Sequence, residues 1–159
     1  MVYIGNTIIL LVLVSSVLLI IAFTVWSKSF RLDNKGAMTP LMLAAQANHT
    51  DTVKSLLAQG ADLNAKNAGG GWTALMFASM EGKTDTVQLL ISQGAEVNVQ
   101  QKNGWTALML AVDFGHADTV QVLLEKSADI NVKDTEGVTA VIIATKKGYS
   151  EIVELLNSV

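Results

Sequence analysis

TPLMLAA at residues 39–45 returns three times in altered form, and this repetition decides the fold. The later copies are TALMFAS at residues 73–79, TALMLAV at residues 106–112 and TAVIIAT at residues 139–145. They begin at Thr39, Thr73, Thr106 and Thr139, so the successive spacings are 34, 33 and 33 residues. A fixed period in this range is typical of proteins built from stacked units, none of which can bury its apolar side alone.

A second phrase follows each copy and predicts a second helix in every unit. The four versions are HTDTVKSLL, KTDTVQLLI, HADTVQVLL and YSEIVELLN. Their apolar residues recur at the spacing of one helix face, and the acidic residue near each start suits the helix dipole. We therefore expect second helices that open at Thr50, Thr84, Ala117 and Ser150.

Residues with special backbone roles separate these helices. Each Thr that begins a first helix can accept a hydrogen bond from an unpaired N–H of the first turn, and Pro40 suits the first helical position. The first helices are expected to break at Asn48, Gly82, Gly115 and Gly148. Gly60 and Gly94 predict left-handed caps for two of the second helices, and Ser127 takes this place in the third.

Together these phrases resemble the ankyrin repeat family, whose signature contains T-P-L-H-x-A-A, G-H, V-x-x-L-L and G-A-D-V-N. The chain has GADLN, GAEVN and SADIN at the corresponding places, with Asn64, Asn98 and Asn131 in the same register. The resemblance covers residues 33–159 and implies an all-α solenoid of helix-turn-helix units with β-hairpin loops. The expected repeats are residues 33–66, 67–100, 101–133 and 134–159.

The chain departs from the family pattern in three respects. An apolar residue replaces the His of T-P-L-H in every unit, so we expect the hydrogen bonds of that His to be absent and the surfaces between units to be more apolar. The replacing residues are Met42, Met76, Met109 and Ile142. Residues 68–71 contain one extra residue, which predicts a looser hairpin tip. The last unit stops in its second helix at Val159 and is expected to act as a short C-terminal cap.

An apolar stretch of a different character precedes the repeats. Residues 7–26 carry no charge, and 14 of these 20 residues are Leu, Ile, Val or Phe. As a helix they would extend about 30 Å, the thickness of a bilayer's hydrocarbon core. A cleaved signal peptide would need a basic start, a shorter apolar run and small residues at the cleavage site. We therefore expect a single-pass transmembrane helix between a short tail, residues 1–6, and a linker, residues 27–32.

Charges beside this span predict its orientation. Lys28, Arg31 and Lys35 follow the span, with Asp33 among them, and no basic side chain precedes it. Because basic flanks stay in the cytoplasm, the N-terminus is expected outside and the repeats are expected in the cytoplasm. The bias amounts to three charges, so a repeat domain on the periplasmic or outer side is the alternative.

Composition and the remaining motifs argue against most chemistry. The chain has no Cys, two His and a net charge of −3, and therefore offers no thiolate site and no overall basic field for nucleic acid. Residues 81–84, EGKT, lack the upstream glycine of a P-loop, and the His-x-Asp pairs at His49 and His116 suit repeat turns better than catalytic dyads. We expect no enzyme activity, no cofactor, no metal site and no small-molecule substrate.

Two sets of residues differ between units where the framework residues agree, as a partner-binding surface would. The first set directly precedes the Thr caps and contains Met38, Trp72, Trp105 and Val138. The second set ends the first helices and contains Gln46, Met80, Glu81, Asp113, Phe114, Lys146 and Lys147. By the resemblance, both belong to the concave face through which ankyrin stacks bind proteins. The tryptophans either anchor a partner, since aromatic residues often dominate interface energy, or pack along their hairpins.

The resemblance and the apolar span together imply a membrane-anchored module or scaffold for protein–protein interaction. Its expected partner is a membrane protein or a membrane complex, and its expected anchor lies in the lipid bilayer. The alternative is an accessory or structural subunit of a larger membrane complex, held mainly by the transmembrane helix. Capture of a partner by the repeats without the span would distinguish the first possibility from the second.

Overall fold

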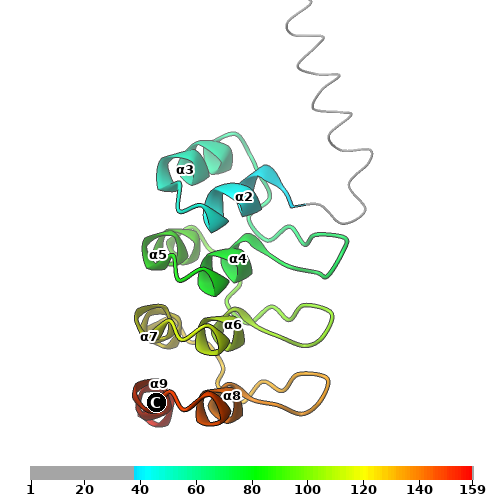
Figure 1. Ribbon diagram of the computed structural model, residues 1–159. Helices are drawn as coiled ribbons and strands as arrows, with labels where there is room; N and C mark the ends of the chain where they lie inside the picture. The colour runs from blue at the N-terminus through cyan, green and yellow to red at the C-terminus, as the bar shows by residue number, and fades with distance from the viewer. Residues whose placement is uncertain (1–37, 159) are drawn as a thin grey trace, which may run out of the picture. The chain divides into compact units, whose positions relative to one another are not determined.

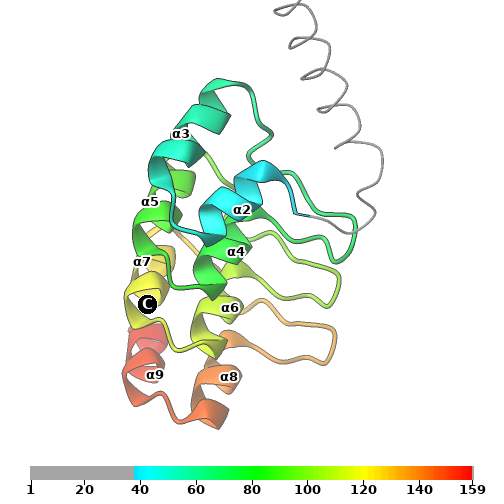
Figure 2. The same ribbon diagram turned by 45° about the horizontal axis from the view of Figure 1, so that its top comes forward.

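Eight short helices form four helix pairs in the part of the chain that the structure, a computed structural model, describes, residues 38–158. The first helices of the pairs, here called the first row, are α2 (Pro40–Gln46), α4 (Ala74–Met80), α6 (Ala107–Asp113) and α8 (Ala140–Lys147). The second row contains α3 (Thr50–Ala58), α5 (Thr84–Ser92), α7 (Ala117–Glu125) and α9 (Ser150–Asn157). The two rows lie side by side, and the loops between pairs project beyond the first row (Figures 1 and 2).

Threonine caps fix the start of every first-row helix, as the sequence predicts. Each capping hydroxyl accepts a hydrogen bond from the backbone N–H three residues further along, at 3.2 to 3.4 Å. The four caps are Thr39, Thr73, Thr106 and Thr139. Pro40 occupies the first turn of α2, where its missing N–H would have had no helical partner.

Left-handed residues end the helices at the expected positions. Asn48 adopts this conformation after α2, with φ of 59°, where the later pairs have glycine. Asparagine tolerates it because its short polar side chain can form a local hydrogen bond. Here Oδ1 of Asn48 accepts from the Thr86 hydroxyl at 2.7 Å, which connects the first pair to the second. Ser127, with φ of 62°, likewise takes the place that glycine has after α3 and α5.

Methionines fill the surfaces between neighbouring pairs. Met42, Met76 and Met109 are each only 1% exposed, so the expected apolar junctions are confirmed. Replacing the His of the family pattern does not leave this position without a hydrogen bond in the first pair. There the Met42 sulfur accepts the Thr39 N–H at 3.3 Å, because a thioether is still a weak acceptor and its flexible chain reaches the cap.

The loops between pairs are closed turns, and the expected β-hairpins are not formed, since residues 38–158 contain no strand. One backbone hydrogen bond joins the two arms of each later loop, from Gln101 N–H to the Trp105 carbonyl and from Asp134 N–H to the Val138 carbonyl, both at 3.0 Å. A second bond lies inside each turn, from Gly104 N–H to the Gln101 carbonyl at 2.8 Å and from Gly137 N–H to the Asp134 carbonyl at 3.0 Å. A strand pair needs a ladder of such bonds, and these arms are too short to add a second rung.

Residues 68–71, which contain the extra residue, are held by the next unit. The backbone N–H of Lys102 donates to the Gly70 carbonyl at 2.8 Å. The Lys102 ammonium group donates to the carbonyls of Ala68 and Gly69, each at 3.1 Å. These bonds accommodate the insertion, so the structure does not show the looser tip that the sequence predicts.

Among the helices between residues 38 and 158, none combines the length and the apolar character needed to cross a membrane. The transmembrane helix predicted at residues 7–26 lies outside the described residues. The same is true of the tail at residues 1–6, the linker at residues 27–32 and the first five residues of the repeat expected at residues 33–66.

Candidate interaction surface

The residues that directly precede the Thr caps form a line along the stack, here called the cap row. Each one lies two residues before the start of a first-row helix. All four are partly buried and pack against the hydrophobic core. The cap row consists of Met38, Trp72, Trp105 and Val138.

Trp72 makes contacts within its own unit. Its ring stacks on Phe77 of α4 with the ring centroids 5.2 Å apart and an angle of 28° between the planes. A Cβ placed on Gly70 would lie 2.5 Å from the indole, so this indole lies directly over the loop backbone. Such an offset aromatic pair contributes about 0.5 to 1.5 kcal/mol beyond its buried area. Packing along the loop, one of the two interpretations of this residue, is what the structure shows.

Trp105 connects its loop to the next one. Its indole N–H donates to Oδ2 of Asp134 at 3.1 Å. The other carboxylate oxygen of Asp134 accepts the backbone N–H groups of Glu136 at 2.9 Å and Val138 at 2.8 Å. Asp134 therefore organises the turn that precedes α8 and fixes the orientation of the tryptophan.

These hydrogen bonds perturb the titration of Asp134. The N–H of Val138 contributes most to holding the pKa of this carboxyl below its usual value, and the Glu136 N–H and the Trp105 indole act in the same direction. Partial burial opposes them. The net lowering shows that the fold favours the ionised carboxylate.

We expect Asp134→Asn to reduce stability in a pH-dependent way. A folded-state pKa below the ordinary value of about 3.9 stabilises the protein above that value, and the contribution disappears as pH falls through the folded-state pKa. The urea midpoint of the variant should therefore lie below that of the unchanged chain at pH 7, and the gap should narrow below about pH 4. Glu136→Gln, an exposed neighbour, is the control and should shift neither curve. An Asp134→Asn gap of equal size at pH 7 and pH 3 would contradict this account.

The residues at the ends of the first-row helices form a second line, here called the end row. Several of them are paired across a junction. Gln46 donates from Nε2 to Oε1 of Glu81 at 3.0 Å, and the Lys147 ammonium lies 2.8 Å from Oδ1 of Asp113. The hydrogen bond to Asp113 raises the pKa of Lys147. Differences between units in this row thus include polar pairs that join one unit to the next.

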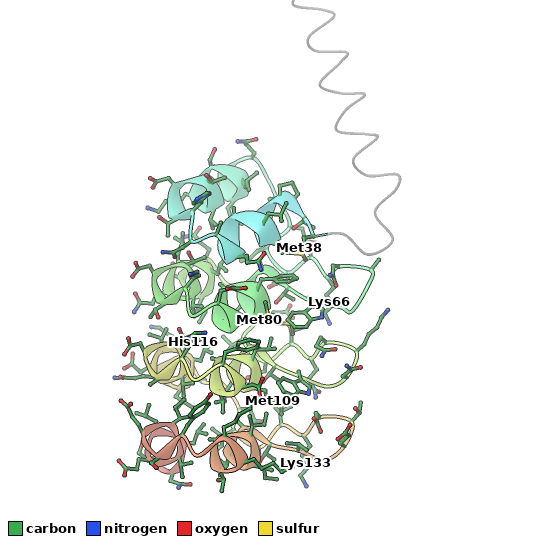
Figure 3. The ribbon with its side chains drawn as sticks, in the orientation of Figure 1. Met38, Lys66, Met80, Met109, His116 and Lys133 are labelled. Atoms are coloured by element: carbon green, nitrogen blue, oxygen red, sulfur yellow. The ribbon has the colours of Figure 1, made fainter. Side chains whose placement is uncertain are left out.

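Met80 and Phe114 are the apolar members of the end row. The Met80 carbonyl lies 2.9 Å from Nε2 of His116, which donates to it across the junction (Figure 3). The Phe114 ring is nearly parallel to the His116 ring, at a centroid distance of 6.4 Å and an angle of 9°. Phe114 itself is 53% exposed and has a large apolar surface open to solvent. Among the exposed large hydrophobic residues of the part that the structure describes, Phe114 has the largest exposed fraction.

Five of the predicted residues line one hollow of about 240 Å³ at the third and fourth pairs. These five come from both rows, and they are Trp105, Asp113, Val138, Lys146 and Lys147. Asp134, Glu136 and Ile143 complete the lining. The hollow therefore combines aromatic and aliphatic surface with charges of both signs. The other predicted residues lie along the same rows but do not line this hollow.

A second hollow, of about 370 Å³, lies at the turns between the two rows and is lined mainly by polar groups. It contains His116 and Asp118, which the sequence analysis attributes to a repeat turn. The His116 ring contacts Gly82 and bonds to the Met80 carbonyl, which gives it a structural role. Residues 38–158 contain no group of three or more His, Cys, Asp or Glu side chains arranged to hold a metal ion.

The regular spacing of the loop asparagines is visible in the sequence, but their role is visible only in the structure. Oδ1 of Asn64 accepts the Glu96 N–H at 3.0 Å, and Oδ1 of Asn98 accepts the Asp129 N–H at 2.9 Å. Each asparagine thus connects its own unit to the following one. The sequence does not single out Asp134, whose bond to the Trp105 indole forms only when the loops stack.

The family comparison agrees with this architecture. The chain matches the family model described as ankyrin repeats (3 copies) over residues 13–101 and again over residues 75–158. These matches extend over most of the sequence, and the chain belongs to the ankyrin repeat family. Proteins of this family are typically modules for protein–protein interaction rather than enzymes. No curated protein matches the sequence.

Proposed function

We propose that this chain is a membrane-anchored protein-interaction module that binds a partner protein through its cap and end rows. Membership of the ankyrin repeat family supports the interaction role. The uncharged apolar stretch at residues 7–26 supports the anchor. The partner we propose is a membrane protein or a membrane complex, which an anchored module would meet beside the bilayer.

One observation supports the choice of the cap and end rows as the binding surface. The hollow beside Trp105 and Val138 lies on the same rows as the 53% exposed Phe114. An exposed aromatic side chain next to a hollow of mixed polarity offers an apolar anchor and a polar rim, which is how binding energy is usually distributed at protein interfaces. Lys146 also lines the hollow, and it is exposed and available to an acidic group of the partner.

The orientation of the anchor is part of the proposal. Lys28, Arg31 and Lys35 favour a cytoplasmic repeat domain with the N-terminus outside. Protease added to intact cells should then leave the repeats uncut. Digestion of the repeats under these conditions would place them on the periplasmic or outer side instead.

Site-specific photo-cross-linking tests the binding surface. A photoreactive amino acid in place of Phe114 should cross-link a partner in native membranes, whereas the same group in place of Gln121, exposed on α7, should not. Phe114→Ala should reduce capture of that partner by about tenfold, equivalent to about 1.4 kcal/mol. Equal cross-linking from both positions, or capture unchanged by Phe114→Ala, would overturn the assignment of the surface.

The second candidate function, an accessory subunit held by its span, is favoured by residues 7–26 alone. Exchange of these residues for an unrelated apolar span of the same length distinguishes the two candidates. If the repeats bind the partner, the exchanged chain should still capture it. If capture is lost while the chain remains in the membrane, the span itself is the binding element.

A further inference from the structure

The two ends of the stack can be recognised from exposure at equivalent positions. Leu43 of α2 is 49% exposed, whereas its counterparts Phe77, Leu110 and Ile143 are 9%, 3% and 5% exposed. The first pair differs from the others in having no described pair before it. This position must therefore point toward the preceding pair, and in the first pair no helix of residues 38–158 covers it.

The opposite end shows the reverse pattern. Ile142 of α8 is 40% exposed, whereas Met42, Met76 and Met109 at the same position are each 1% exposed. This position must therefore point toward the following pair. Leu43 and Ile142 are thus the two sides of one type of junction, left open at opposite ends of the stack.

Other positions define the same two faces. The leading face carries residues that are exposed or partly exposed only in the first pair, and it consists of Pro40, Leu43, Thr52 and Leu56. The trailing face carries residues that are exposed or partly exposed only in the last pair. It consists of Val141, Ile142, Thr145 and Val153. Both faces are largely apolar, whereas solenoids usually end in capping units with a polar outer surface.

We propose that the trailing face of one copy of this chain binds the leading face of a second copy, head to tail. The occupant follows from continuity, because the two faces have the register of the junctions inside the stack. Within the chain, a leading face already packs on a trailing face at each of the three junctions between the four pairs. A second copy presents the same positions again.

The turns between the rows support this match. A Cβ placed on Gly82 would lie 2.6 Å from the His116 ring, and one on Gly115 would lie 3.1 Å from the Tyr149 ring. Each of these glycines is therefore covered by a ring of the next pair. Gly148 has nothing within 4 Å of the same point. His49 is exposed at the position equivalent to His116, so His49 of a second copy would cover Gly148 as His116 covers Gly82.

Polar groups at the two faces are compatible with this contact. The Thr145 hydroxyl donates to the carbonyl of Val141 at 2.8 Å and would not be stranded by burial. In the second row, Lys54 of α3 and Glu154 of α9 occupy equivalent positions, and the middle pairs have the uncharged Gln88 and Gln121 there. Head-to-tail stacking would bring the lysine of one copy beside the glutamate of the other.

The contact is heterologous, since two different surfaces meet. Each added copy leaves one leading and one trailing face free, so the assembly grows as an open row rather than closing as a dimer. Open growth distinguishes this head-to-tail contact from a symmetric dimer, in which the same face of both copies would meet.

Cross-linking between tagged copies of the full chain tests the proposal. The chain has no cysteine, so single introduced cysteines report unambiguously. One copy carries Leu43→Cys and a differently tagged copy carries Ile142→Cys, and both are expressed together and treated with a short bismaleimide. We expect cross-links between the two tags and none between copies of one tag. Phe114→Cys paired with Leu43→Cys is the control for random encounter, since Phe114 is 53% exposed but lies on neither face.

Charge reversal provides the second arm. Glu154→Lys in the Ile142→Cys copy should reduce the cross-linked product by about fivefold, and Lys54→Glu in the Leu43→Cys copy should restore it. The two side chains are exposed and make at most a 3.7 Å contact, between Lys54 and Asp51, so folding should be unaffected. Cross-links that form equally between copies of one tag, or with the Phe114→Cys control, would overturn the proposal. So would absence of the mixed product, which is the outcome if another part of the chain covers the leading face.

Discussion

Gly104→Ala is expected to destabilise the repeat domain by about 2 to 5 kcal/mol. Gly104 has φ of +84°, and the left-handed conformation costs an L-residue about 1 to 2 kcal/mol. Its Cβ would also lie 2.7 Å from the Cα of Asp134 and 3.0 Å from the Thr135 nitrogen. These are backbone atoms of the next loop and cannot swing aside as a side chain can, so overpacking adds about 1 to 3 kcal/mol.

Gly137→Ala is the matched control for this prediction. Gly137 has the same role in the next loop and φ of +80°, but its Cβ would meet nothing within 4 Å. This variant should therefore lose only the conformational cost of about 1 to 2 kcal/mol. Urea unfolding followed by far-UV circular dichroism measures both variants. Equal losses would show that the contact between neighbouring loops does not restrict Gly104.

Met109→Ala is the second change with a large expected effect, a loss of about 2 to 5 kcal/mol. Met109 is 1% exposed and lies at the junction between the third and fourth pairs, where a shorter side chain leaves a cavity. The main contacts of each pair are with its neighbours, so a weakened junction should also uncouple α8 and α9 from the rest of the stack. Unfolding should become less cooperative as well as easier.

Ile142→Ala tests whether the loss of stability comes from the closed junction or from the truncation of an apolar side chain alone. Ile142 occupies the same helix position as Met109, but 40% of it is exposed and no described pair lies over it. At protein concentrations where the chain is monomeric, we expect its truncation to cost less than about 1 kcal/mol. Equal costs at the two positions would contradict the assignment of Met109 to a closed junction.

The sequence predicted those features that depend on residues close together in the chain. A Thr cap binds an N–H only three residues away, and the left-handed turns at Asn48 and Ser127 are conformations of single residues. The period of 33 to 34 residues then predicts the stacking, because every unit must cover the apolar side of its neighbour. The caps predicted the helix starts, and the period predicted that the methionines between units would be buried.

Other features depend on distances between units that a period does not specify. The bonds between Gln46 and Glu81 and between Asp113 and Lys147 exist because adjacent first-row helices approach closely enough for particular rotamers. The expected hairpins were wrong for a related reason, since these loop arms resemble the family's hairpins in sequence but add no second bond between the arms. Neither outcome could be decided from residue types alone.

Differences between units proved ambiguous as a sign of partner binding. Trp72 and Trp105 differ from Met38 and Val138, yet each tryptophan contacts residues of its own chain. Phe114 differs as well and stays exposed. Contact of these rows with a partner stays a prediction, and exposure rather than variation now indicates which residue to test first.

The repeated junction has a consequence for the gene. Deletion of residues 73–105 would place Thr106 directly behind Trp72, where Thr73 now stands, and Thr119 would reach the position from which Thr86 donates to Asn48. A duplication of the same segment would preserve the register in the same way. One in-frame recombination event can therefore shorten or lengthen this protein by a whole helix pair and keep the register of the junctions.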